Sequence, residues 1–162
     1  MKMITILCAA LALVSCDRAE TNGPTRIVSV ASPFSPTVGI GLQISPQTLP
    51  ITTITTIACP FVSAFRTGFQ LVVVPARDGS IFMDRVTLRL VDGSNIGGPA
   101  VTFPRPELNS MFGSTLVVST RAFAFQPQFG CLVARPRVMA ADVVFVDGAG
   151  DSRTVTVSAS LQ

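Results

Sequence analysis

The sequence contains no histidine, no tryptophan and no tyrosine, and its only lysine is Lys2. Without histidine, neither a Ser-His-Asp nor a Cys-His arrangement can be built, and imidazole-ligated zinc or copper is excluded as well. Removal of an N-terminal signal would take away the one lysine, which excludes Ser-Lys dyads, Schiff bases and a phosphate-loop lysine. Carboxylates are the remaining route to catalysis, and no cofactor is expected.

Charge is also scarce. Charged residues make up 13% of the chain and hydrophobic residues 48%, a balance that argues against disorder for most of its length. The formal net charge is only +3, and the basic residues are scattered apart from Arg135-Pro136-Arg137. Nucleic-acid binding needs a clustered basic stripe. We therefore expect no nucleic-acid partner.

The N-terminus has the parts of an export signal: Lys2 is followed by an apolar stretch from Met3 to Val14. This stretch is shorter than the roughly 20 residues that a transmembrane helix needs. Leu13-Val14-Ser15-Cys16 resembles the lipobox of bacterial lipoproteins. The resemblance implies cleavage before Cys16, lipidation of its thiol and anchoring to a bacterial membrane that faces the periplasm or the exterior. The alternative is an ordinary secretory signal in which Cys16 is incidental.

On this interpretation, residues 1–15 are the signal, residues 16–37 are the lipidated N-terminus and a tether, and residues 38–162 form one domain. Cys8 leaves with the signal and Cys16 carries lipid, so Cys59 and Cys131 remain as a pair. Disulfides form and persist in exported proteins, which predicts a Cys59–Cys131 bridge. Two free buried thiols are the alternative. Because Pro60 follows Cys59 and Gly130 precedes Cys131, we expect both cysteines to flank strands rather than lie inside them.

Period-two alternation predicts strands along the domain. The pattern is plain in Val38–Ser45, Phe69–Val73, Val86–Leu90, Arg121–Phe125, Val138–Val146 and Thr154–Ala159. Ile51, Ile54 and Ile57 are spaced by three, so the inward face of that segment is ambiguous. Only Pro104–Gly113 favours a helix, with Leu108, Met111 and Phe112 on one face.

Short strands with almost no helix predict an all-β fold, an antiparallel β-sandwich with at most one short helix. The Cys59–Cys131 separation and the terminal hairpin make the domain resemble immunoglobulin-like and fibronectin-like sandwiches. It departs from the antibody type because it has no tryptophan, and Phe129 stands where a corner tyrosine is common.

The carboxylates that could pair for glycosidase-like chemistry are Asp84, Asp92, Glu107, Asp142 and Asp147. Most follow turns or alternate with core positions, which favours solvated surface acids and no catalytic residues. Asp147 and Asp151 form a tight acidic loop and are a weak Ca²⁺ candidate. A plain hairpin loop explains them better, so no metal site is expected.

Three further patterns have structural interpretations. Gly97-Gly98 precedes no helix and is expected to be a turn. Phe61, Phe65 and Phe69 recur every four residues and are expected to fill the core. Arg135 and Arg137 could meet anionic headgroups or glycans, although a solvated loop is the simpler interpretation.

The sequence thus predicts a lipid-anchored protein of the cell envelope with a non-catalytic structural, adhesive or binding role, towards envelope protein or glycan. The alternative is a carboxylate-based hydrolase that acts on envelope polysaccharide.

Overall fold

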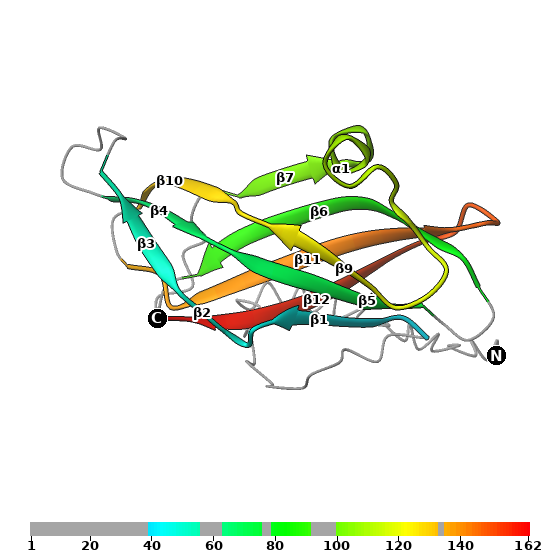
Figure 1. The fold of residues 1–162 in the computed structure, drawn as a ribbon, viewed down its shortest axis with the longest axis horizontal. Coiled ribbons are helices and arrows are strands. Elements are labelled where there is room, and N and C mark those ends of the chain that lie inside the picture. Colours follow the sequence, from blue (N-terminus) through cyan, green and yellow to red (C-terminus); the bar gives the residue numbers. More distant parts are fainter. Residues whose placement is uncertain (1–38, 56–62, 76–78, 92–99, 133–134) are drawn as a thin grey trace, which may run out of the picture.

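Long antiparallel strands dominate the computed structural model, which describes residues 39–55, 63–75, 79–91, 100–132 and 135–162 (Figure 1). One layer is a sheet in the order β2-β12-β11-β6-β7, with the short β8 paired to β6 beside this path. Its strands are β2 (Thr48–Leu49), β6 (Ile81–Val91), β7 (Val101–Pro104), β8 (Leu116–Val117), β11 (Val138–Asp147) and β12 (Ser152–Leu161).

The second layer consists of two three-stranded sheets, β1-β5-β9 and β10-β4-β3, which meet end to end. They meet because β4 leads into β5 past Gly68, and β9 leads into β10 past two residues. The strands are β1 (Gly41–Ser45), β3 (Ile51–Ile54), β4 (Ser63–Thr67), β5 (Phe69–Val74), β9 (Arg121–Phe125) and β10 (Gln128–Leu132). All described strand pairs are antiparallel except β2 with β12.

The core lies between the two layers, and the period-two pattern determines which side chains enter it. In β5, Phe69, Leu71 and Val73 are buried while Gln70 is exposed. The same alternation buries Leu42 and Ile44 in β1 and Phe123 and Phe125 in β9. The predicted all-β antiparallel sandwich is therefore confirmed.

Helix α1 (Arg105–Phe112) is the one helix among the described residues, at the position that the sequence predicted. A proline in its first turn suits the helix start, and Gly113 ends it with a positive φ of 73°. Leu108 is fully buried, but Met111 is 43% exposed, so the expectation that Met111 shares the buried face was wrong. The short helix buries only a narrow strip, along Leu108 and the half-buried Phe112.

Between β2 and β3 the chain crosses from one layer to the other. β2 pairs with β12, whereas β3 pairs with β4 in the second layer. The crossing is fixed by backbone hydrogen bonds, from Ile51 N to Gln162 O and from Gln162 N to Leu49 O, both of 2.9 Å. Ile51 and Ile54 are both half-buried at this crossing, which explains why their spacing predicted no clear inward face.

On the opposite flank, α1 lies beside the edge strand β7 (Figure 1). Its Phe112 ring belongs to a cluster of aromatic rings that includes Phe123 and Phe125 of β9. Phe125 is at its centre, with ring centroids 5.3–5.5 Å from those of Phe69, Phe103 and Phe112. Phe65 and Phe69 are buried as the sequence predicted. Phe61 lies outside the described residues, as does Gly97-Gly98.

Candidate functional site

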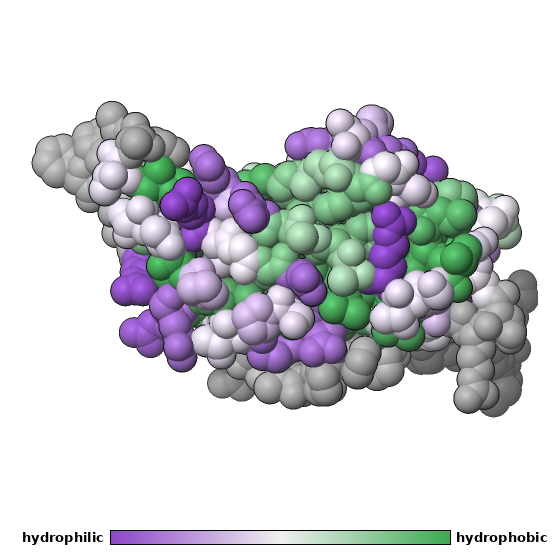
Figure 2. Space-filling view, viewed as in Figure 1, coloured by the Kyte–Doolittle hydropathy of each residue, from purple (hydrophilic) through white to green (hydrophobic). Residues whose placement is uncertain are grey.

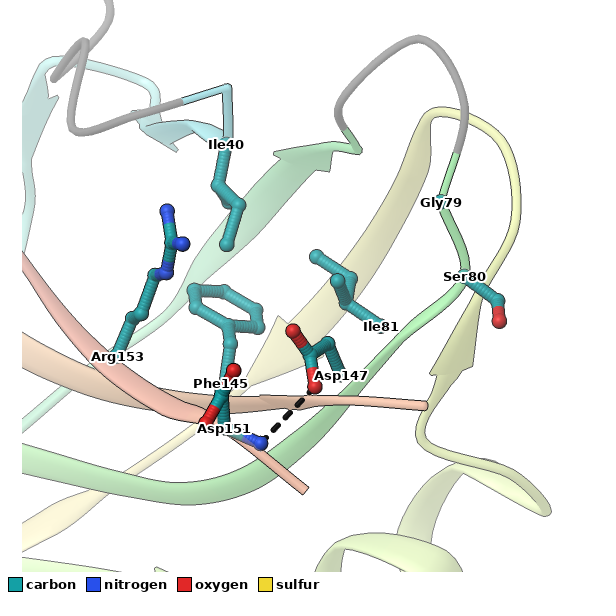
Figure 3. Close-up of a pocket in the computed structure, with 8 residues that line it drawn as sticks. All are labelled: Ile40, Gly79, Ser80, Ile81, Phe145, Asp147, Asp151 and Arg153. Atoms are coloured by element: carbon teal, nitrogen blue, oxygen red, sulfur yellow. Dashed lines mark hydrogen bonds between the residues drawn. The ribbon is translucent and has the colours of Figure 1, made fainter. Parts of the chain in front are cut away.

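A pocket of about 170 Å³ opens at the end of the sandwich where β1 begins (Figure 3). The buried side chains of Ile40, Ile81 and Phe145 point into it from three different strands or strand ends. Asp147 and Arg153, from the β11–β12 hairpin, lie at its rim. The pocket is therefore apolar at its base and charged at its mouth.

The hairpin loop at this pocket is organised by one carboxylate. Asp147 Oδ1 accepts hydrogen bonds from the backbone N–H groups of Ala149 and Asp151, both of 2.9 Å. Gly150 adopts a positive φ of 92°, a conformation that a side chain would strain. Asp147 thus has a structural part in the turn, as expected of a plain hairpin loop.

The weak Ca²⁺ candidate, Asp147 with Asp151, lies in this loop. The two residues come together as predicted, but through the Asp151 backbone N–H and the Asp147 carboxylate. Within the part of the chain that the structure describes, no three His, Cys, Asp or Glu side chains gather as a metal site would require.

The outer face of the larger sheet carries a second carboxylate, Asp142 of β11. Its Oδ2 accepts a hydrogen bond of 2.9 Å from Arg89 Nε and lies 2.6 Å from the second guanidinium nitrogen. Its Oδ1 accepts one of 2.7 Å from Thr156 Oγ1. Thr87 and Thr102 continue the polar row, with their hydroxyl oxygens 3.2 Å apart. Both oxygens of Asp142 are therefore engaged by neighbouring strands.

Asp84 lies further along this sheet, at a β-bulge. Arg85 pairs with Val144 and Met83 with Phe145, which leaves Asp84 as the extra residue. Asp84 Oδ1 lies 2.9 Å from Arg105 Nε, an ion pair without hydrogen-bond geometry. The Arg105 guanidinium also stacks over the Phe82 ring, 5.2 Å from its centroid.

The other predicted acids are dispersed. Glu107 is exposed in the first turn of α1, where a negative charge suits the helix dipole. Asp92 lies outside the described residues. The described acids thus occupy a sheet face, a helix start and a hairpin loop.

Four exposed arginines have no hydrogen-bond or ion-pair partner for their guanidinium groups among the described residues: Arg66, Arg85, Arg135 and Arg137. Pro136 is buried between two of them, so that Arg135 and Arg137 both face solvent from the irregular segment before β11. The sequence pattern indicated Arg135 and Arg137 as a possible site but gave no sign of Arg66, because the neighbours of Arg66 in space come from distant parts of the chain.

Cys131 lies within β10, so the expectation that it flanks a strand was wrong. Gly130 does not end the strand, because pairing with β4 continues through a register shift between Phe129 and Leu132. Cys131 is disulfide-bonded. Its predicted partner Cys59 lies outside the described residues, and the pairing stays a prediction.

The signal, the lipidation site Cys16 and the tether also lie outside the described residues. Among those that are described, no helix is both long and apolar enough to cross a membrane.

Comparisons with known proteins concern the fold. No family model and no curated protein matches the chain. The X-ray structure of a Northeast Structural Genomics Consortium target, SoR45, is similar over 76% of this chain and 86% of its own, with 10% sequence identity and a TM-score of 0.52. Target BeR40 from Bordetella pertussis, described as an ApaA protein, covers 80% of this chain and 96% of its own at 9% identity and a TM-score of 0.45. The likeness to SoR45 supports the sandwich architecture alone.

Proposed function

We propose that the mature chain is a lipid-anchored β-sandwich of the bacterial cell envelope with a non-catalytic binding role. The anchor is supported by the lipobox-like Leu13-Val14-Ser15-Cys16 after an apolar stretch. We include in this proposal the resemblance of the domain to immunoglobulin-like sandwiches. A sandwich of this kind presents loops at both ends, where binding sites are common.

The observation that best supports the non-catalytic role is that three of the predicted carboxylates are held in hydrogen bonds or ion pairs. Hydrolysis of a glycosidic bond needs one carboxyl that donates a proton and a second that acts as nucleophile or base, roughly 5–10 Å away across a cleft. Asp142 is held by Arg89 and Thr156, and Asp84 is paired with Arg105. Asp147 holds the hairpin turn. Such engaged acids favour a structural role over the hydrolase alternative.

The position of β1 supports an orientation on the membrane. β1 begins with Gly41 opposite Val74, at the end of the sandwich that holds the pocket. A tether that precedes β1 joins the sandwich at this end, so we place it nearest the membrane. Arg66 and Val74 are eight positions apart along β4–β5, which corresponds to roughly 26 Å. The opposite end therefore faces away from the anchor.

Labelling with radioactive palmitate in a bacterial host tests the anchor. The full chain and the control Cys8→Ala should incorporate label and sediment with membranes, whereas Cys16→Ala should do neither. Label retained in Cys16→Ala would overturn the lipid-anchor proposal. Release of reducing ends from envelope polysaccharide that Asp142→Asn abolishes would overturn the non-catalytic role.

A further inference from the structure

The end of the sandwich opposite the pocket carries arginines from two distant parts of the sequence. Arg137 comes just before β11 and lies between the last residues of β6 and β12, the two strands next to β11. The backbone N–H of Arg137 donates a hydrogen bond to Val91 O of β6, and the carbonyl oxygen of Arg137 accepts one from Leu161 N of β12. Its backbone is thus fixed on both sides, and the side chain leaves a rigid element. Arg135, two residues earlier in the same irregular segment, is also exposed, and Pro136 between them is buried.

Arg66 is brought to the same end by the crossing between the layers. The residue after Leu161, Gln162, accepts a hydrogen bond from Ile51 N. Ile51 pairs with Thr67 of β4, and the next pair along joins Thr52 to Arg66. Figure 2 shows hydrophilic side chains gathered at this end, on the left of the view. We call Arg66, Arg135 and Arg137 the distal arginines.

The distal arginines are exposed, and none has an ion-pair partner among the described residues. Arg89 and Arg105, by contrast, each pair with a carboxylate on the larger sheet. Arg66 is flanked on its neighbouring strands by the uncharged Thr52 and Gln128. Among the described residues, no carboxylate therefore pairs with the guanidinium groups at this end.

The chemistry of the group indicates the partner. A guanidinium presents a planar fork of donors that matches a carboxylate in two parallel hydrogen bonds. Side chains on separate rigid segments favour a ligand whose negative charges are spaced along a chain. A surface that inserts into a membrane would need exposed apolar side chains at this end. The exposed large hydrophobic residues of the described part are Met111 and Val118, and they lie around α1 and β8. An acidic polysaccharide fits the surface better than a lipid bilayer.

We propose that the distal arginines bind an acidic polysaccharide of the cell envelope. The proposal rests on the binding role given above and does not depend on the lipid anchor. It assigns binding to the end of the sandwich opposite the pocket and the start of β1.

Fluorescence anisotropy of labelled polygalacturonate, titrated with the full chain in detergent, tests this inference. Polygalacturonate should bind, neutral dextran of equal length should not, and added NaCl should weaken binding. Arg66→Gln, Arg135→Gln and Arg137→Gln should each weaken it by about fivefold. The matched control is Arg85→Gln, which removes another exposed, unpaired arginine from β6. It should change affinity by less than about twofold.

Melting temperatures of the variants establish that they are folded. Equal loss with Arg85→Gln would mean that net charge, and not the distal end, drives binding, and would overturn the inference. So would binding to phosphatidylglycerol vesicles without binding to polygalacturonate. If the chain bound a neutral glycan and the three substitutions left that affinity unchanged, the proposal of an acidic partner would be overturned. The proposed binding role would still stand.

Discussion

Replacement of Asp142 by asparagine tests whether this acid is structural. The substitution keeps the shape of the side chain but removes the charge that Arg89 and Thr156 contact. The side chains of Arg89 and Asp142 are 41% and 24% exposed, so solvent screens the pair and it contributes at most about 1 kcal/mol. The hydroxyl bond to a charged acceptor adds up to about 1 kcal/mol. Together these give an expected loss of about 1 kcal/mol, and at most about 2 kcal/mol, in the free energy of unfolding.

Thermal unfolding followed by circular dichroism measures this loss. At about 4 °C per kcal/mol for a domain of this size, the melting temperature should fall by about 4 °C, and at most by about 8 °C. Arg89→Met and the double variant complete a cycle, whose coupling energy should be about 0.5–1 kcal/mol. Glu107→Gln is the control, because Glu107 is exposed and loss of its interaction with the helix dipole should change stability by less than about 0.5 kcal/mol. An unchanged melting temperature in Asp142→Asn, or zero coupling to Arg89, would refute the reasoning.

Three other substitutions or treatments have defined outcomes. Phe125→Ala should lower the free energy of unfolding by about 3–5 kcal/mol, because the Phe125 ring is fully buried among three other rings. Urea titration measures this loss, and Ala124→Ser, at an exposed position, is the control. Asp147→Ala should cost about 1 kcal/mol by leaving two amides without their acceptor, and Ca²⁺ should not raise the melting temperature; a Ca²⁺-dependent rise that Asp151→Ala abolishes would contradict this. Intact mass should increase by about 2 Da on reduction of the predicted Cys59–Cys131 bond, and alkylation of both cysteines without reductant would exclude the bond.

The strands that the sequence predicted best are those buried on one face. In β5 and β9 the alternation of apolar with small or polar residues indicated both the strand and its inward side chains, because one face of each lies against the core. Only the part of β6 from Val86 onwards was predicted. The strand begins at Ile81, and the bulge at Asp84 breaks the alternation between Met83 and Val86.

Strands that lack this alternation were missed. Ser63–Thr67 mixes polar and apolar residues without alternation, and β10 contains Gly130 and Cys131, which were interpreted as a loop. Tertiary pairing with each other stabilises both as strands.

The surface chemistry was less predictable than the fold. Arg89 and Asp142 are 53 positions apart, and only the register of β6 with β11 brings them together. Arg66 reaches the end that holds Arg137 through the crossing at Ile51, which no local pattern encodes. Composition indicated which chemistries were lacking, whereas the position of each charge depended on strand pairing.

The central claim is that the chain is processed and lipidated at Cys16. Mass spectrometry of the N-terminal peptide from the membrane fraction tests it most directly. The account predicts a mature chain that begins at Cys16 and carries diacylglyceryl and acyl groups, with no peptide from residues 1–15. An unmodified Cys16 within an uncleaved or differently cleaved chain would contradict it.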